Sequence, residues 1–173
     1  MPIDDPITRR DVMAGAAATA ALVAAGADAQ RRGGSGDLTR LSVAEAGRRI
    51  AARELSPVEL TRAYLERIES VDPRINSYIT VTADRALEQA RALEAELGRG
   101  RYRGPLHGIP LGLKDNIDTA GILTTAASAV YANRIPTEDA ECVRKLRDAG
   151  AVFLGKLNMH EFAYGGTSAV TVI

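Results

Sequence analysis

Residues 104–118 read GPLHGIPLGLKDNID, and the rest of the chain can be understood from this stretch. A short apolar run, 109–113, is punctuated by glycine and proline and is followed at once by Lys114, Asp115 and Asn116. Such a run predicts a strand that ends in a polar turn. An ammonium group is costly to bury unless a partner compensates its charge or it loses its proton. The lysine at the end of this strand is therefore a candidate for chemistry.

Lys114 allows two other interpretations. A lysine just past a strand is commonly a solvated end residue with no role in chemistry. A phosphate-binding loop is the second alternative, because Gly108 and residues 112–114 loosely resemble one. That loop needs serine or threonine directly after the lysine to reach a magnesium ion, and here Asp115 follows instead. The sequence thus excludes the phosphate-binding loop.

The flanking sequence predicts an α/β fold around this strand. A helix is expected over 138–149 and a buried strand over 151–154, so that the two strands should be parallel. Upstream, hydroxyl residues followed by glutamate predict helix starts at Ser42 and Ser56. The second of these helices should stop before the Asp72-Pro73 pair, because the residue before proline disfavours the helical conformation.

Alternating β-branched residues over 76–81 predict a further strand. A longer helix is expected over 83–97, with Gly98 as its stop. The apolar positions of this helix recur at helical spacing and should face the core; they are Ala86, Ala90, Leu93 and Leu97.

The composition excludes several classes of function. The chain has 173 residues, of which 22 are basic and 22 acidic, so nothing suggests a nucleic-acid partner. Its single cysteine, Cys142, excludes an internal disulfide, and together with only His107 and His160 it gives no metal-binding spacing. We therefore expect no cofactor and no metal. Both histidines should make local hydrogen bonds, and Cys142 should be a small apolar filler on a helix.

The first thirty residues differ from the rest. Arg9 and Arg10 form a twin-arginine pair, and a weakly hydrophobic segment follows. Ala27-Asp28-Ala29 matches the cleavage pattern of a signal peptide. These features predict an export signal over 1–29, cut after Ala29. A flexible linker over 30–40 and a domain over 41–173 would then follow. The expected location is the bacterial periplasm or the exterior, with membrane contact only during export; a disordered tail or an uncleaved anchor is the alternative.

Three blocks of the sequence together resemble a known family. They are GIPLGLKDNI (108–117), TTAAS (124–128) and AGAVFLGKLNMHEF (149–162), and in this order and spacing they are similar to the amino-terminal third of the amidase signature family. The resemblance covers about residues 41–168. It implies a mixed sheet with helices on both faces, incomplete in this chain, and a small-molecule amide as substrate.

The same resemblance implies roles for two residues. Lys114 falls on the lysine of the family's Ser-cisSer-Lys triad, and Tyr164 falls where the family lines the acyl pocket. In family members the lysine, held neutral, takes the proton of the nucleophilic serine through the bridging serine. Because burial is what depresses the pKa of a lysine, the side chain of Lys114 is expected to be shielded from water.

The remaining hydroxyl residues are expected to have local roles. A serine or threonine in a turn usually caps the backbone, and the motif offers no histidine to activate Thr124, Thr125 or Ser128. The family's nucleophilic and bridging serines are expected further along than Ile173, so the 173-residue chain by itself is expected to be inactive. The alternative is a truncated, non-catalytic remnant or an interaction module that uses the same half-fold.

Overall fold

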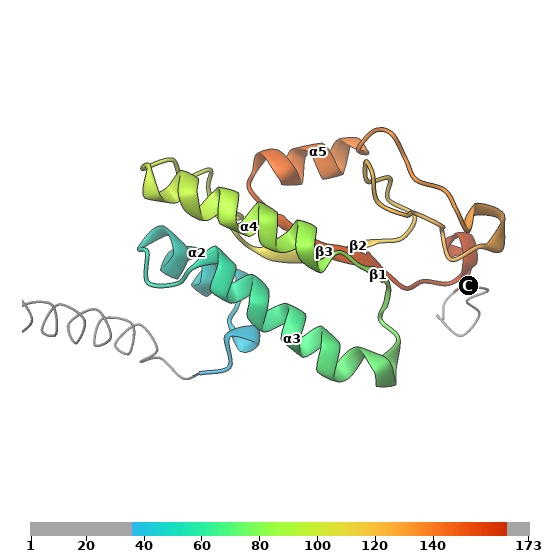
Figure 1. The fold of residues 1–173 in the computed structure, drawn as a ribbon, viewed down its shortest axis with the longest axis horizontal. Helices are drawn as coiled ribbons and strands as arrows, with labels where there is room; N and C mark the ends of the chain where they lie inside the picture. The colour runs from blue at the N-terminus through green and yellow to red at the C-terminus, as the bar shows by residue number, and fades with distance from the viewer. Residues whose placement is uncertain (1–35, 166–173) are drawn as a thin grey trace, which may run out of the picture. The chain divides into compact units, whose positions relative to one another are not determined.

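A computed structural model describes residues 36–165 of the chain. That part forms four α-helices and a mixed three-stranded sheet (Figure 1), which confirms the predicted α/β class. None of its helices is both long enough and apolar enough to cross a membrane. The predicted export signal lies outside the described residues, and so do its four marker residues, Arg9, Arg10, Ala27 and Ala29.

Serine caps begin the first two helices, as predicted. Before α2 (Val43–Ala51), the Ser42 hydroxyl accepts a hydrogen bond from the backbone N–H of Glu45 at 3.1 Å. Before α3 (Pro57–Ile75), the Ser56 hydroxyl accepts from two backbone N–H groups. Each serine thus satisfies donors that the first helical turn leaves free.

The predicted end of α3 is wrong, because the helix continues through Pro73 to Ile75. Proline removes only one hydrogen bond there, and the last turn has other support. Asn76 adopts a left-handed conformation, with φ of 48°, and donates its N–H to the Asp72 carbonyl at 2.7 Å. The Asp72 carboxylate in turn accepts the N–H of Ser77 at 2.7 Å. This double cap ends the helix after the proline rather than before it.

The sheet has the strand order β1-β3-β2. Strand β1 (Tyr78–Val81) is antiparallel to β3 (Val152–Leu157), and β2 (Pro110–Lys114) is parallel to β3. Helix α5 (Glu141–Asp148) lies between β2 and β3 in the chain, so the predicted strand-helix-strand unit with parallel strands is confirmed.

Helix α5 begins later than the predicted start at residue 138. The reason is that the preceding residues are hydrogen-bonded to the loop after β2 instead. The N–H of Ala140 donates to the Asp118 carbonyl, and the Asp139 carboxylate accepts the N–H of Ala120 at 2.8 Å.

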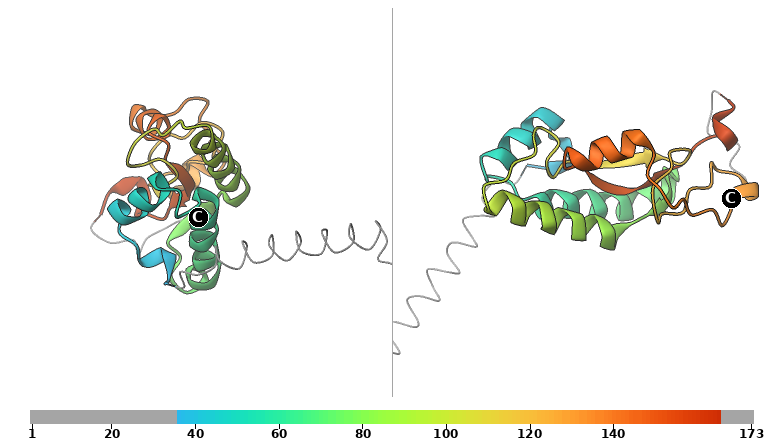
Figure 2. Two further views of the ribbon diagram at one scale, coloured as in Figure 1. Left: turned by 90° about the vertical axis from the view of Figure 1, so that its left-hand side faces the viewer. Right: turned by 90° about the horizontal axis from the view of Figure 1, so that it is seen from above.

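Helices cover both faces of the sheet. One apolar cluster joins α3 and α4 (Ala83–Gly98) to β3, and another joins α5 to β2 and β3. In Figure 1, α5 lies above the strands and α3 below them, and Figure 2 shows α3 and α4 side by side. The four apolar positions predicted for α4 are all buried: Ala86, Ala90, Leu93 and Leu97.

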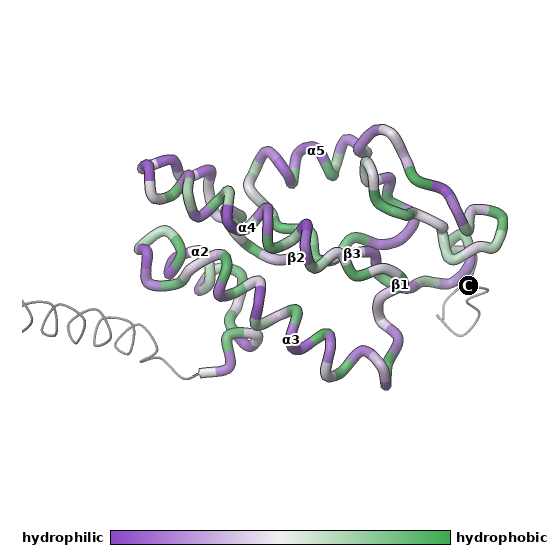
Figure 3. The backbone as a smooth tube through the Cα atoms, in the orientation of Figure 1, coloured by the Kyte–Doolittle hydropathy of each residue, from purple (hydrophilic) through white to green (hydrophobic). Residues whose placement is uncertain are grey.

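Helix α5 contributes little apolar surface, as its mostly hydrophilic colour in Figure 3 shows. Val143 is its one fully buried side chain. The preceding residue, Cys142, is exposed, so the prediction that it fills the core is wrong. On a helix, neighbouring residues point about 100° apart, and only one of these two can face the sheet.

The two histidines have the local roles that were predicted. His107 is fully buried, and its Nδ1 accepts the N–H of Arg103 at 3.2 Å, so its Nε2–H donates to the Leu93 carbonyl at 3.0 Å. Nδ1 of His160 lies 3.3 Å from the carbonyl oxygen of the next residue. Among the described residues, no group of three or more potential ligands could hold a metal ion.

A bulge in β3 changes which side chains face which helices. On β2, Leu111 pairs with Phe153 but Gly112 pairs with Gly155, so one residue of β3 is left over. An extra residue reverses the alternation of side chains beyond it. Leu154 packs in the cluster with α3 and α4, whereas Lys156 pairs with Leu113, which packs against α5. The bulge therefore turns Lys156 toward the α5 side of the sheet.

Candidate functional site

Lys114 is the last residue of β2, which is an edge strand of the described sheet. Its side chain is exposed, and within residues 36–165 no hydrogen bond or ion pair holds its ammonium group. The expectation that this amine is shielded from water is therefore wrong for the described chain. The physical reason is its place at the end of an edge strand: Leu113 turns into the α5 cluster, Lys114 points to the other face, and the apolar cluster on that face joins α3 and α4 to β3 and contains no residue of β2.

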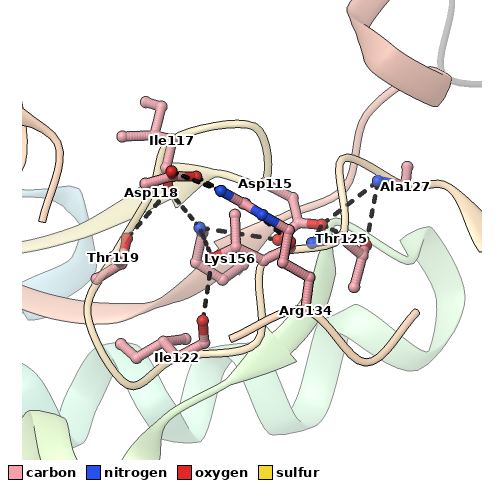
Figure 4. Close-up of polar contacts among 10 residues, drawn as sticks. Asp115, Ile117, Asp118, Thr119, Ile122, Thr125, Ala127, Arg134 and Lys156 are labelled. Atoms are coloured by element: carbon pink, nitrogen blue, oxygen red, sulfur yellow. Dashed lines mark hydrogen bonds and ion pairs between the residues drawn. The ribbon is translucent and has the colours of Figure 1, made fainter. Parts of the chain in front are cut away.

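Asp115 follows immediately and is fully buried. Its Oδ2 accepts hydrogen bonds from the backbone N–H of Thr125 at 2.9 Å, from the Thr125 hydroxyl at 2.5 Å and from the N–H of Ala127 at 3.4 Å (Figure 4). Ala126 and Ala127 are both left-handed, with φ of 53° and 54°. Residues 125–127 thus form a concave nest of N–H groups, a shape that suits an anion, and the Asp115 carboxylate fills it.

Lys156 is the desolvated lysine of the structure, and the sequence patterns gave it no role. Its side chain is 0% exposed, and Nζ donates to the Ile117 carbonyl at 2.6 Å and to the Thr124 hydroxyl at 2.7 Å. Burial lowers the pKa of Lys156 to about 8, although the nearby Asp115 carboxylate acts in the opposite direction. The sequence feature that could have indicated a buried Lys156 is its position in a mostly apolar run, 151–157. The strand predicted there stops at residue 154 and so does not include it.

Asp115 and Lys156 form a buried ion pair without a direct hydrogen bond. Nζ lies 3.8 Å from Oδ1 of Asp115, and that oxygen has no hydrogen-bond partner among the described residues. The attraction is therefore mainly Coulombic. Removing one partner of a buried pair leaves the other charge buried without a partner, which typically lowers the stability of the fold by about 3–5 kcal/mol. Each of the two residues therefore needs the charge of the other to remain buried in its ionised form.

An ion pair nearer the surface closes the loop around this centre. The Arg134 guanidinium donates two hydrogen bonds to the Asp118 carboxylate, at 2.8 and 2.6 Å, and holds the pKa of Asp118 below its ordinary value (Figure 4). The N–H of Thr124 also donates to the Arg134 carbonyl at 2.9 Å. These hydrogen bonds connect the first and second halves of the loop between β2 and α5 to each other beside Lys156.

The hydroxyl residues have the capping roles that were predicted. The Thr125 hydroxyl accepts the N–H of Ala127, and the Thr124 hydroxyl donates to the Ile122 carbonyl. Ser128 is buried; its hydroxyl accepts the N–H of Val130 and donates to the Glu161 carboxylate at 2.6 Å.

Tyr164 does not contribute to a buried pocket in the described chain. Its side chain is 87% exposed, next to Phe162 and Ala163, which are both left-handed. Its role in an acyl pocket stays a prediction. The structure thus brings Asp115, Thr124, Thr125 and Lys156 together and leaves Lys114 and Tyr164 at the surface.

Comparison with known proteins gives consistent matches. The family model for amidases matches residues 59–173. The chain is 46% identical over 132 residues to a glutamyl-tRNA(Gln) amidotransferase subunit from Carboxydothermus hydrogenoformans, covering 76% of this chain and 27% of that protein.

Solved structures agree with the sequence relatives. The peptide amidase of Stenotrophomonas maltophilia is 47% identical, with a TM-score of 0.68 over 72% of this chain and 26% of that one. A fatty acid amide hydrolase is 30% identical, with a TM-score of 0.67, over 70% of this chain and 22% of that one. The chain spans about a quarter of the length of these relatives. On the family match and the shared fold, this chain belongs to the amidase signature family.

Proposed function

We propose that this chain is the amino-terminal part of an amidase that hydrolyses the carbon–nitrogen bond of a small-molecule amide, with Lys114 as its general base. The observation that carries the proposal is the position of Lys114 within the matched family segment. This lysine ends a strand, has an ammonium group that no residue within 36–165 engages, and is followed directly by an anchored carboxylate.

The chemistry explains why a lysine suits this position. Amides are poor electrophiles with poor leaving groups, so cleavage needs an activated nucleophile, a stabilised oxyanion and a proton for the departing amine. A neutral Lys114 would take the proton of a serine through the bridging serine and later return a proton to the amine. Neither serine is assigned among the described residues. The acyl-enzyme would then be hydrolysed by water, with no cofactor.

A neutral base at Lys114 requires a drier environment than the described chain provides. Desolvation lowers the pKa of a lysine, and Lys156 shows that effect inside this fold. For Lys114, which is exposed, the covering residues must come from outside 36–165.

The proposal is tested on protein expressed from its own genomic locus with the flanking coding sequence kept, hereafter the locus-expressed protein. We expect it to release ammonia from simple amides and peptide amides, measured by a coupled ammonia assay. Amide cleavage that needs an added acyl-tRNA acceptor, with the ammonia transferred to that acceptor instead of released, would instead indicate a transferase. No release from any amide would overturn the proposal.

We further propose that the protein is exported and acts in the periplasm or outside the cell. The twin arginines, Arg9 and Arg10, and the Ala27-Asp28-Ala29 pattern support this proposal, and export is the reason to propose water as the acceptor rather than a nucleic-acid-bound group. Mass spectrometry of the exported protein should find a mature start near Gln30. An intact amino terminus in a cytoplasmic fraction would contradict export.

A further inference from the structure

The turn that follows Lys114 is held from within the core by the buried side chain of Lys156. The N–H of Ile117 donates to the Lys114 carbonyl at 3.0 Å and closes the turn. The carbonyl of the same residue, Ile117, accepts a hydrogen bond from Nζ of Lys156 at 2.6 Å (Figure 4). Lys156 therefore contacts the turn whose first residue is Lys114.

A second connection runs through Asp115. Its N–H extends the pairing with β3 by donating to the Leu157 carbonyl at 3.2 Å, and its own carbonyl accepts the N–H of Ala126 at 3.1 Å. Its carboxylate is shared between the nest of residues 125–127 and the ammonium of Lys156. The residue next to Lys114 is thus fixed by backbone and side chain together.

Lys156 itself is unsuited to touch a substrate. It is fully buried, and its amine is engaged by the Ile117 carbonyl and the Thr124 hydroxyl. The bulge at residues 154–155 turns it toward the α5 side of the sheet, whereas alternation along β2 turns Lys114 away from that side. The two lysines lie on opposite faces, so the effect of one on the other must pass through the shared turn.

We infer that Lys156, acting through Asp115 and the 114–117 turn, is a positioning residue that fixes the place of Lys114. The inference rests on the proposed function. Residue pairing supports it: Leu113, directly before Lys114, is the register partner of Lys156. An error of about 1 Å in the placement of a reacting group can cost about 100-fold in rate. A loosened turn would therefore slow catalysis without changing the residues that carry it out.

The test compares matched variants of the locus-expressed protein. Thr125→Val removes the hydroxyl that holds Asp115, Thr125→Ser keeps it, and Lys156→Met removes the ammonium. Lys145→Met on the exposed face of α5 is the control. We expect Thr125→Val and Lys156→Met to lower kcat per active site about 10- to 100-fold with KM changed less than about threefold. Thr125→Ser and Lys145→Met should stay close to the parent.

Counting active sites separates positioning from folding. A serine-directed phosphonate titrates the folded, competent fraction, and rates are expressed per titrated site. Amide hydrogen exchange at Ile117 and Ala126 should also be at least about 10-fold faster in Thr125→Val. Should Lys156→Met fail to fold, the Thr125 pair still decides the question.

Each outcome bears on a different claim. If Thr125→Val has a normal kcat per site, or unchanged amide hydrogen exchange at Ile117 and Ala126, the positioning role of Lys156 is overturned. The proposed function is left intact by either result. A parent protein without amide hydrolysis would overturn the proposed function, and with it the catalytic part of this inference.

Discussion

Replacing Lys114 with alanine is expected to lower kcat for amide hydrolysis by about 10³-fold or more in the locus-expressed protein. A positioned general acid or base typically contributes about 10²–10⁴-fold, and Lys114 is proposed to serve in both steps. KM should change little, because a base that acts only as the proton moves adds nothing to ground-state binding. Steady-state kinetics with a peptide amide, together with the thermal midpoint of each variant, provide the measurement.

Two companion variants make the Lys114 prediction specific. Lys114→Arg keeps the positive charge but cannot become neutral near pH 7, so it should be as inactive as the alanine variant. Lys145→Ala removes another exposed lysine, on α5, and should leave kcat unchanged. Substantial activity in Lys114→Arg would show that only charge is needed at this position, and the proposed base mechanism would then fail.

Periodicity was sufficient to predict most of the elements. The apolar face of α4, the serine caps of α2 and α3, and the parallel pairing of β2 with β3 all agree with the sequence. These features depend on local spacing and on hydroxyl residues at helix starts, which a sequence shows directly. The end of α3 was missed because a left-handed Asn76 and the Asp72 carboxylate together replace the stop expected at Pro73.

The site was harder to predict, because it depends on contacts between distant segments. The family resemblance implied that Lys114 is shielded from water, but the structure exposes Lys114 and buries Lys156, for which no role was predicted. Exposure of Lys114 follows from strand order, since β2 lies at the edge, and sequence does not reveal strand order. Lys156 is buried because β3 is the central strand, and the bulge that reverses the alternation of β3 decides which face of the sheet it points to. The nest around Asp115 uses left-handed alanines, which have no sequence signature of the kind glycine gives.

The bulge also identifies a substitution with a large expected effect on stability, Gly155→Ala. Gly155 has φ of +153°, and a Cβ atom there would lie 2.1 Å from the Thr80 carbonyl oxygen of β1. The clash is with backbone, so no side chain can move aside. Backbone strain costs about 1–3 kcal/mol and overpacking a similar amount or more. The expected loss of about 4 kcal/mol is a large share of the stability of an ordinary domain.

A loss of that size should lower the thermal midpoint of the locus-expressed protein by several degrees in scanning calorimetry, because 1 kcal/mol corresponds to about 2–4 °C for a protein of about 150–250 residues and to less for a longer one. Gly98→Ala is the matched control, because a Cβ atom at Gly98, the last residue of α4, would meet nothing within 4 Å, and this variant should be neutral or slightly stabilised. The β1–β3 pairing would separate first, since Val81 is the register partner of Gly155. Lys156 directly follows Gly155, so that separation would also allow the Lys156 side chain to leave the α5 side of the sheet, toward which the bulge turns it. A Gly155→Ala midpoint equal to that of Gly98→Ala would show that β1 can move aside, and the bulge would then not be what fixes Lys156.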